Sequence, residues 1–165
     1  MIAFPGRALF EDMANGFEER LTALRLELPP PASPAANTVN CRRTGNLLFV
    51  GPHGPVTPSG LVRGKVPTRV SVREARSAAR AATLAALSSA RKELGSLDRI
   101  RQVVSIFGMV NCAPTFTRMP EVLDGSPEVL VELFGDAGLH VRTTGGMAEL
   151  PFDVAVEVEL VLEVD

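Results

Sequence analysis

The chain has 165 residues, of which 45% are hydrophobic and 22% charged, and its formal net charge at pH 7 is −2. This length and balance favour one domain with a buried core, and the scattered basic residues give no footprint for a nucleic-acid backbone. No apolar run approaches the ~20 residues that a membrane-spanning helix needs. The N-terminus lacks a signal-peptide pattern, and the two cysteines show no metal-ligand spacing. We therefore expect a cytoplasmic protein that contacts neither membranes nor nucleic acid.

The N-terminal segment predicts an amphipathic helix followed by a stiff linker. Between residues 7 and 27, apolar side chains recur at three- and four-residue steps, at Phe10, Met13, Phe17, Leu21 and Leu24. The prolines of residues 28–34 cannot continue a helix and stiffen the connection. We expect a helical extension over residues 1–28 that packs on the main domain, 29–165, or on a neighbouring subunit. A proline-rich ligand for a partner is the alternative interpretation of the linker.

The next segment predicts two short strands and a long loop. Residues 38–43 and 47–50 are strands around Thr44-Gly45-Asn46, a turn of the hairpin type. Residues 56–70 contain proline, glycine and arginine and are expected to form a loop, as are residues 51–54 before them. His53 within residues 51–54 is either a general acid or base near neutral pH or a loop histidine without a chemical role.

A long helix follows this loop. Ser71 and Glu74 form a capping-box pattern, and the helix that they begin runs to about Leu94, before Gly95. Its inward face is mostly alanine, which allows close approach to a sheet, whereas its arginines indicate a solvated face.

A central strand and a second helix come next. Residues 100–111 are rich in Val, Ile and Phe, and Gly108 among them marks a bulge or a close backbone approach. Ser126-Pro127 predicts an N-cap and a first helical position for a helix over residues 128–134.

The stretch from residue 140 to residue 164 contains the candidate site. Its second half alternates with the two-residue period of a strand that has one buried face. Leu150-Pro151-Phe152-Asp153 supplies a turn, so the run ahead of it is expected to pair with this strand as an antiparallel hairpin. The hairpin would bring Arg142 near Glu157 and Glu159, where an arginine and a carboxylate could hold an anionic substrate and move its protons.

The order helix, β, β, α, β, α, β, β predicts an α+β layer, in which two helices pack on one face of a mostly antiparallel or mixed sheet. The other face of such a sheet stays exposed unless a partner covers it. Glu157 and Glu159 on the less apolar side of the last strand fit a surface that lines an interface or a cleft.

Four separated stretches resemble the RidA/YjgF/UK114 family, in the family's order and over residues 28–165. They are Arg43–Val50, the alanine-rich helix after Val70, Ile106–Asn111, and Arg142 together with Gly145–Pro151 and Val156–Glu159. The resemblance implies a chorismate-mutase-like fold that assembles as a homotrimer, with a pocket at each subunit boundary. The family's usual short form lacks the N-terminal helix.

The resemblance also implies a chemistry. Active relatives hydrolyse 2-iminoacids and their enamine tautomers to 2-ketoacids and ammonia, without a metal or an organic cofactor. The family's arginine corresponds to Arg142, whose fork of donors suits a substrate carboxylate. Its acidic residue corresponds to Glu157, which would orient water and relay protons, although Glu159 could take this role. The backbone near Thr144 and the loop 51–54 would complete the pocket.

Several positions depart from the pattern of active relatives. Gly51 and His53 stand where many relatives have serine and glutamine, Thr144 stands where cysteine is frequent, and the tyrosine ahead of the first strand has no counterpart. Arg142 could instead form an interface salt bridge with an acidic side chain.

Three functions follow from the resemblance. The first is a RidA-like imine and enamine deaminase, and the second is a trimeric protein that holds a small carboxylate or ketoacid without converting it. The third, endoribonuclease or translation inhibitor, is a label that some relatives carry. It finds no support in this sequence, which has no basic patch, no Tyr or Trp and only 2 histidines.

Overall fold

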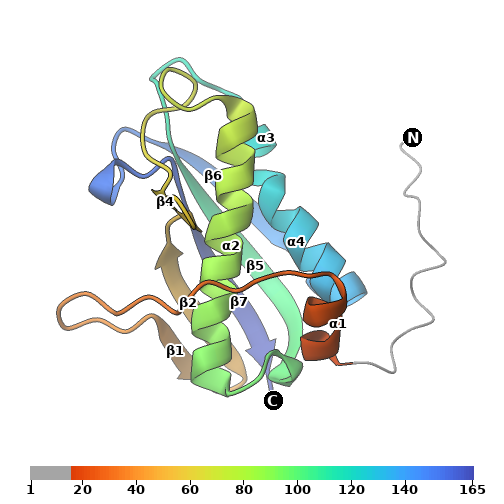
Figure 1. Cartoon of the computed structure of the whole chain (residues 1–165). Coiled ribbons are helices and arrows are strands. Elements are labelled where there is room, and N and C mark those ends of the chain that lie inside the picture. Colours follow the sequence, from red (N-terminus) through yellow and green to blue (C-terminus); the bar gives the residue numbers. More distant parts are fainter. Residues whose placement is uncertain (1–15) are drawn as a thin grey trace.

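A five-stranded mixed sheet forms the centre of the structure, a computed structural model that describes residues 16–165 (Figure 1). The order across the sheet is β1-β2-β7-β5-β6, and all neighbours are antiparallel except β5 and β6, which are parallel. The strands are β1 (Cys41–Thr44), β2 (Leu47–His53), β5 (Ile100–Asn111), β6 (Val141–Met147) and β7 (Val156–Val164). The predicted mixed sheet is confirmed, and β5 has the bounds that the sequence indicated.

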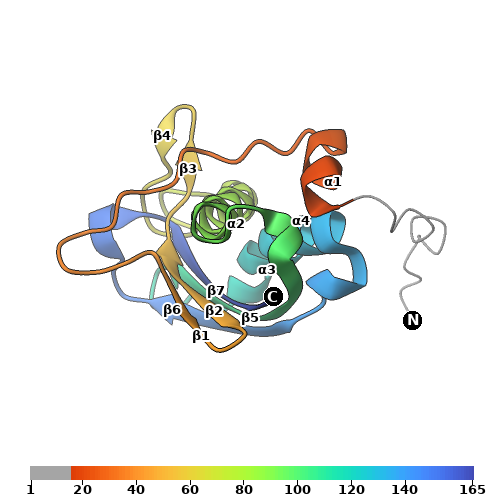
Figure 2. The ribbon, with the colours of Figure 1, turned by 90° about the horizontal axis from the view of Figure 1, so that it is seen from below.

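The helices α2 (Val72–Leu94), α3 (Met119–Leu123) and α4 (Gly125–Phe134) lie on one face of this sheet (Figure 2). On β7, the side chains that face the helices are buried: Val156, Val158, Leu160, Leu162 and Val164. The intervening side chains point to the opposite face, which none of the described helices covers. We call this opposite face the open face; it carries Arg42, Phe49, Ser105, Phe107, Glu157, Glu159 and Val161.

Helix α2 begins and ends as predicted. Ser71 and Glu74 form a complete capping box, and Gly95 ends the helix at φ +84°. The predicted alanine face is buried against the sheet. The predicted solvated arginine face is exposed apart from the half-buried Arg80, and Arg76 and Arg80 also form ion pairs with Glu128 and Glu132 of α4.

The hairpin predicted for residues 140–164 is wrong. Strands β6 and β7 are not neighbours, because β5 lies between them. The chain between β5 and β6 contains α3 and α4, and a crossover that contains helices joins parallel strands. Strand β6 therefore pairs with one side of β5 and β7 with the other, and the 3₁₀ turn η4 (Pro151–Asp153) carries the chain from β6 to β7.

Two further details differ from the predictions. Ser126 does not cap α4: it lies inside the helix and its Oγ donates to the Ala79 carbonyl at 3.3 Å. The segment 51–70 is not all loop, because β2 continues to His53 and a small hairpin follows, formed by β3 (Val56–Thr57) and β4 (Gly60–Leu61). The close approach predicted at Gly108 is confirmed, because a Cβ there would lie 2.1 Å from Cδ1 of Leu123 in α3.

The described part of the N-terminal segment packs on the rest of the chain. Helix α1 (Phe17–Ala23) ends before the predicted residue 27, and residues 7–15 of the prediction lie outside the described part. The Phe17 ring packs edge-on against Phe134, with ring centroids 4.7 Å apart. Residues 26–40 then cross α2 as an extended segment (Figure 1).

Glu18 links α1 to the 3₁₀ turn η2 (Leu97–Arg99) that precedes β5. Its Oε1 accepts a hydrogen bond from the Leu97 backbone N–H at 2.9 Å, and its Oε2 lies 2.9 Å from Nη2 of Arg91. We expect Glu18→Ala to lower the free energy of unfolding by about 1–2 kcal/mol, because a half-buried N–H loses its acceptor. Urea denaturation measures this. The matched control is Glu19→Ala, which removes an exposed glutamate of the same helix; equal losses for both variants would contradict the proposed contact.

Candidate functional site

Two carboxylates lie next to each other on the open face of the sheet, both on β7. Glu157 and Glu159 lie opposite Met109 and Phe107 of β5, respectively. A hollow of about 160 Å³ is adjacent to Glu159. Its lining comes from β2, β5 and β7 and consists of Phe49, Val50, Gly51, Ser105, Phe107, Glu159, Leu160 and Val161. Two predicted residues therefore line the same hollow: the binding residue Gly51 and Glu159, the alternative to Glu157 as the proton-transferring acid.

The environment of Glu157 favours its protonated form. Burial raises the pKa of this carboxyl above its usual value, and the charge of Glu159 raises it further. A carboxyl whose pKa moves towards neutrality can both donate and accept a proton at working pH. The direction of this shift is the one that favours proton transfer by Glu157.

Arg142 lies on the other side of the sheet. It is in register with Ile106 of β5, which in turn lies opposite Leu160, and both of these side chains are buried under the helices. The neighbouring glycines agree with this orientation: a Cβ at Gly146 would meet Met119 of α3, whereas one at Gly145 would meet Phe107 on the open face. Within one chain, the predicted proximity of Arg142 to the β7 carboxylates is therefore wrong.

An aspartate holds the Arg142 guanidinium. Nη1 of Arg142 lies 2.7 Å from Oδ1 of Asp124, at the junction of α3 and α4. The two side chains are 32% and 43% exposed, and a salt bridge with this exposure contributes only about 0–1 kcal/mol. A ligand carboxylate can therefore compete with Asp124 at modest cost. No sequence pattern indicates Asp124, since it lies at the junction of two helices.

Thr144 shares the side of Arg142. It lies opposite Gly108, whose missing side chain makes room for Leu123 of α3. Thr144 is half-buried. The structure thus brings Arg142 and Thr144 to the helix side of the edge strand, and Gly51 and Glu157 to the open face.

His53 is neither in a loop nor near the β7 carboxylates. It is 5% exposed and lies opposite Val158, on the helix side. Its Nδ1 lies 2.7 Å from the Gly51 carbonyl, which makes Nδ1 the donor, so Nε2 accepts from the Ser89 hydroxyl at 2.7 Å. This serine–histidine pair, which the sequence did not indicate, is closed to a substrate because Ser89 is 3% exposed.

Two other kinds of feature are absent from the described residues. Among residues 16–165, no group of three His, Cys, Asp or Glu side chains is placed to hold a metal ion. No helix in this part of the chain is long and apolar enough to cross a membrane.

Fold and site together define an α+β domain with one helix-covered face and one open face that bears carboxylates. The family described as "YjgF/chorismate mutase-like, putative endoribonuclease" matches residues 18–164. The chain belongs to this family, as the sequence motifs predicted.

Individual relatives agree with this assignment. Protein TCP17 of Trypanosoma cruzi is 35% identical over 147 residues, which cover 88% of this chain and 92% of that protein. The crystal structure of Atu1372 from Agrobacterium tumefaciens is 33% identical, covers 90% of this chain and 92% of its own, and has a TM-score of 0.83. A crystal structure from Shewanella oneidensis is described as a "putative endoribonuclease" and is 31% identical. The match covers 91% of this chain and 100% of that chain, with a TM-score of 0.87.

The burial of His53 predicts a pH-dependent stability. Burial lowers the pKa of His53 from 6.5, so the unfolded chain binds more protons and the free energy of unfolding falls as the pH drops below this value. Urea denaturation measures the free energy of unfolding at about pH 8 and at about pH 5. Between these two values, His53→Gln should lose less of this free energy than the wild type.

The matched control is His140→Gln. Burial lowers the pKa of His140 too, but this variant keeps the contribution of His53. An unchanged pH dependence in His53→Gln would show that the His53–Ser89 pair has no such role.

Proposed function

We propose that this protein is an imine and enamine deaminase of the RidA type, which hydrolyses 2-iminoacids to 2-ketoacids and ammonia. The observation that carries the proposal is the half-buried Glu157 on the open face, whose carboxyl has a raised pKa and whose neighbour Glu159 lines a largely apolar hollow. Membership of the YjgF family supports it. The substrate class follows from the resemblance of Arg142 and Glu157 to the family's motif.

The reaction needs a group that moves protons. Water adds its oxygen to the imine carbon, and the carbon–nitrogen double bond becomes a single bond as the nitrogen takes a proton. The resulting carbinolamine loses ammonia only after the nitrogen is protonated again and the hydroxyl gives up its proton. We assign both transfers to Glu157, which accepts a proton first from the attacking water and then from the carbinolamine hydroxyl, and delivers each to the nitrogen. No redox step is involved.

Arg142 is assigned to bind the substrate carboxylate. Its guanidinium offers bidentate donors, and the exposed pair with Asp124 can be exchanged for a ligand. Arg142 and Glu157 lie on opposite faces of one sheet, so one substrate can contact both only if they come from different copies. A homotrimer in which the edge strand β6 of one copy lies against the open face of the next would provide this arrangement.

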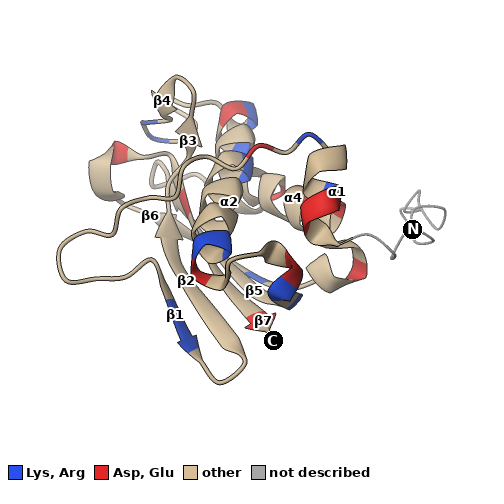
Figure 3. Cartoon of the chain, turned by 60° about the horizontal axis from the view of Figure 1, so that its bottom comes forward, with Lys and Arg blue, Asp and Glu red and all other residues tan. Residues whose placement is uncertain are grey.

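The surface of the sheet supports such an assembly. The open face exposes Phe49 at 45%, and an uncovered apolar sheet face favours a partner. The basic residues Arg42 and Arg43 lie on β1, at the other edge of the sheet (Figure 3). At the proposed contact, the edge strand β6 carries Arg142, whereas the open face carries the β7 glutamates. This difference in charge suits a head-to-tail contact between copies, which closes into a ring.

A second function is the non-catalytic binding of a small carboxylate or ketoacid at the subunit boundary. The observation that favours it is the orientation of Arg142, which can hold an anion without any contribution from Glu157. Binding of 2-ketobutyrate to a protein that does not speed ketoacid release from an imine identifies this second function, because a binder needs only Arg142.

The first test is a coupled assay in which an amino-acid oxidase generates the imine and ketoacid release is followed. We expect Glu157→Gln and Arg142→Ala each to slow release by at least about 10²-fold, the scale of a lost general acid–base group or substrate anchor. Arg118→Ala is the matched control, because Arg118 pairs with Glu121 on the surface at 2.6 Å. If wild type and variants are equally inert while 2-ketobutyrate still binds, the protein is a binder.

Mixing the two inactive variants tests the shared site. If Arg142 and Glu157 act from different copies, co-expressed Arg142→Ala and Glu157→Gln chains should form mixed trimers in which about a quarter of the sites are intact. Ketoacid release should then return in part. A mixed preparation that is trimeric yet inactive would overturn the shared site.

A further inference from the structure

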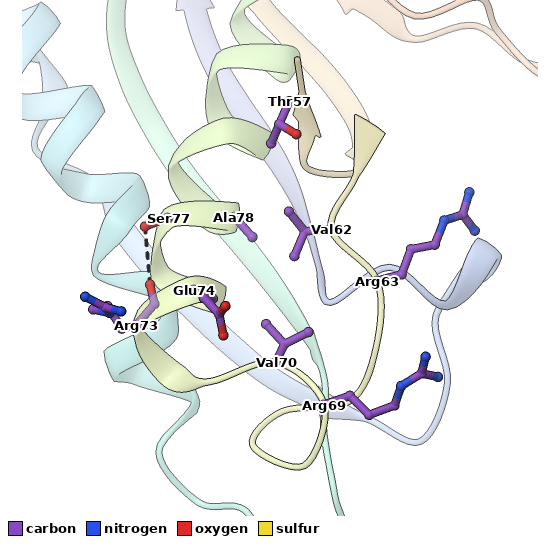
Figure 4. A pocket seen from close by; sticks show the side chains of 9 residues that line it. All are labelled: Thr57, Val62, Arg63, Arg69, Val70, Arg73, Glu74, Ser77 and Ala78. Atoms are coloured by element: carbon purple, nitrogen blue, oxygen red, sulfur yellow. Dashed lines mark hydrogen bonds between the residues drawn. The ribbon is translucent and has the colours of Figure 1, made fainter. Parts of the chain in front are cut away.

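A cleft of about 550 Å³ lies on the helix side of the molecule, away from the β7 carboxylates (Figure 4). It is formed by the first half of α2 and by the segment from β3 to the start of this helix. Its lining residues are Thr57, Val62, Arg63, Arg69, Val70, Arg73, Glu74, Ser77 and Ala78. The volume is in the range of small-molecule sites, roughly 300–1,000 Å³.

The centre of the cleft is apolar. Val62, Val70 and Ala78 lie together there (Figure 4), which suits the body of an organic molecule. Two hydroxyl groups line the sides of the cleft, and both donate hydrogen bonds within the chain. The Thr57 hydroxyl donates to the Gly60 carbonyl at 2.7 Å, and the Ser77 hydroxyl donates to the Arg73 carbonyl at 3.3 Å. Towards a ligand they therefore act as hydrogen-bond acceptors.

The rim of the cleft has an excess of positive charge. Arg63 and Arg69 extend in the same direction, towards the turn at residues 151–153 (Figure 4). Arg63 donates to the Phe152 carbonyl, and Arg69 lies 3.5 Å from an Asp153 oxygen with 72% of its side chain exposed. Most donors of these two guanidinium groups stay free for an anion.

The other charges of the cleft do not cancel this excess. Hydrogen bonds from the Ser71 hydroxyl and backbone N–H hold the Glu74 carboxylate and lower its pKa, so it belongs to the helix cap. On the side of α3, Arg73 forms no ion pair within residues 16–165. The lining of the cleft therefore contains three arginines, against Glu74, which is committed to the helix cap, and the adjacent Asp153, which lies 3.5 Å from Arg69.

We propose that this cleft binds a small organic anion. Its apolar body lies on Val62, Val70 and Ala78, and its carboxylate or phosphate is bound by Arg69 with the help of Arg63. This site is separate from the proposed deaminase site, because Arg142 lies on the edge strand β6 and Glu157 on the open face. The protein then has a second place for a charged metabolite, on the helix layer.

The test is an NMR titration of the full chain with three probes. Phenyl phosphate has both the ring and the charge, inorganic phosphate has only the charge, and benzyl alcohol has only the ring. We expect phenyl phosphate to shift the amides of residues 57–78 and to bind at least about tenfold more tightly than either fragment, since a tenfold ratio needs only about 1.4 kcal/mol. Equal binding of inorganic phosphate, or shifts centred on Asp124 and Arg142, would overturn the proposal.

Variants locate the two halves of the site. Arg69→Gln should weaken phenyl phosphate about tenfold, because it removes a charge-assisted pair, and Ser77→Phe should abolish binding by filling the cleft from an exposed position. Arg80→Gln is the control on the same helix, since Arg80 pairs with Glu132 outside the cleft. Retained affinity in a folded Ser77→Phe protein would show that the ligand binds elsewhere.

Discussion

The parallel pairing of β5 with β6 is the constraint on which the rest of the structure depends. A parallel neighbour requires a long connection, and here the connection is the helical segment from α3 to α4. It moves β6 to the edge of the sheet and leaves the other side of β5 for β7. The parallel pairing sets the position of every candidate residue, because it decides which side chains lie on the same face of the sheet.

The two faces of the sheet consequently differ in chemistry. The helix face is closely filled: the alanines of α2 let the helix approach the sheet, and Leu123 occupies the space over Gly108. A histidine on this face is tied to Ser89 and cannot reach a substrate. The open face has the opposite character, because Glu157 and Glu159 stand there among apolar side chains without a described helix above them.

Because of this separation, the proposed site with Arg142 and Glu157 would need more than one copy of the chain. Arg142 is held at an edge, where its pair with Asp124 is weak enough to be exchanged, and Glu157 lies two strands away on the opposite face. An interface between copies would join what the fold separates. The arginine-rimmed cleft beside α2, in contrast, is complete within one chain.

Local patterns in the sequence determined much of the architecture. Interactions between residues close in sequence produce the capping box at Ser71, the end of α2 at Gly95 and the apolar run of β5. Such local interactions can be predicted from the sequence. The alternation of β7 likewise determined that Val158 and Leu160 are buried under the helices and that Glu157 and Glu159 lie on the opposite face. The family could be recognised from the same stretches.

Only the tertiary structure decided which strands are neighbours. A turn at Pro151 is compatible with a hairpin as well as with a crossing over β5, and the choice depends on packing between segments far apart in sequence. For this reason Arg142 lies opposite Ile106 and pairs with Asp124 instead of meeting the β7 carboxylates. The prediction that His53 lies in a loop is wrong for a similar reason. Its buried position depends on contact with Ser89, 36 residues further along the chain.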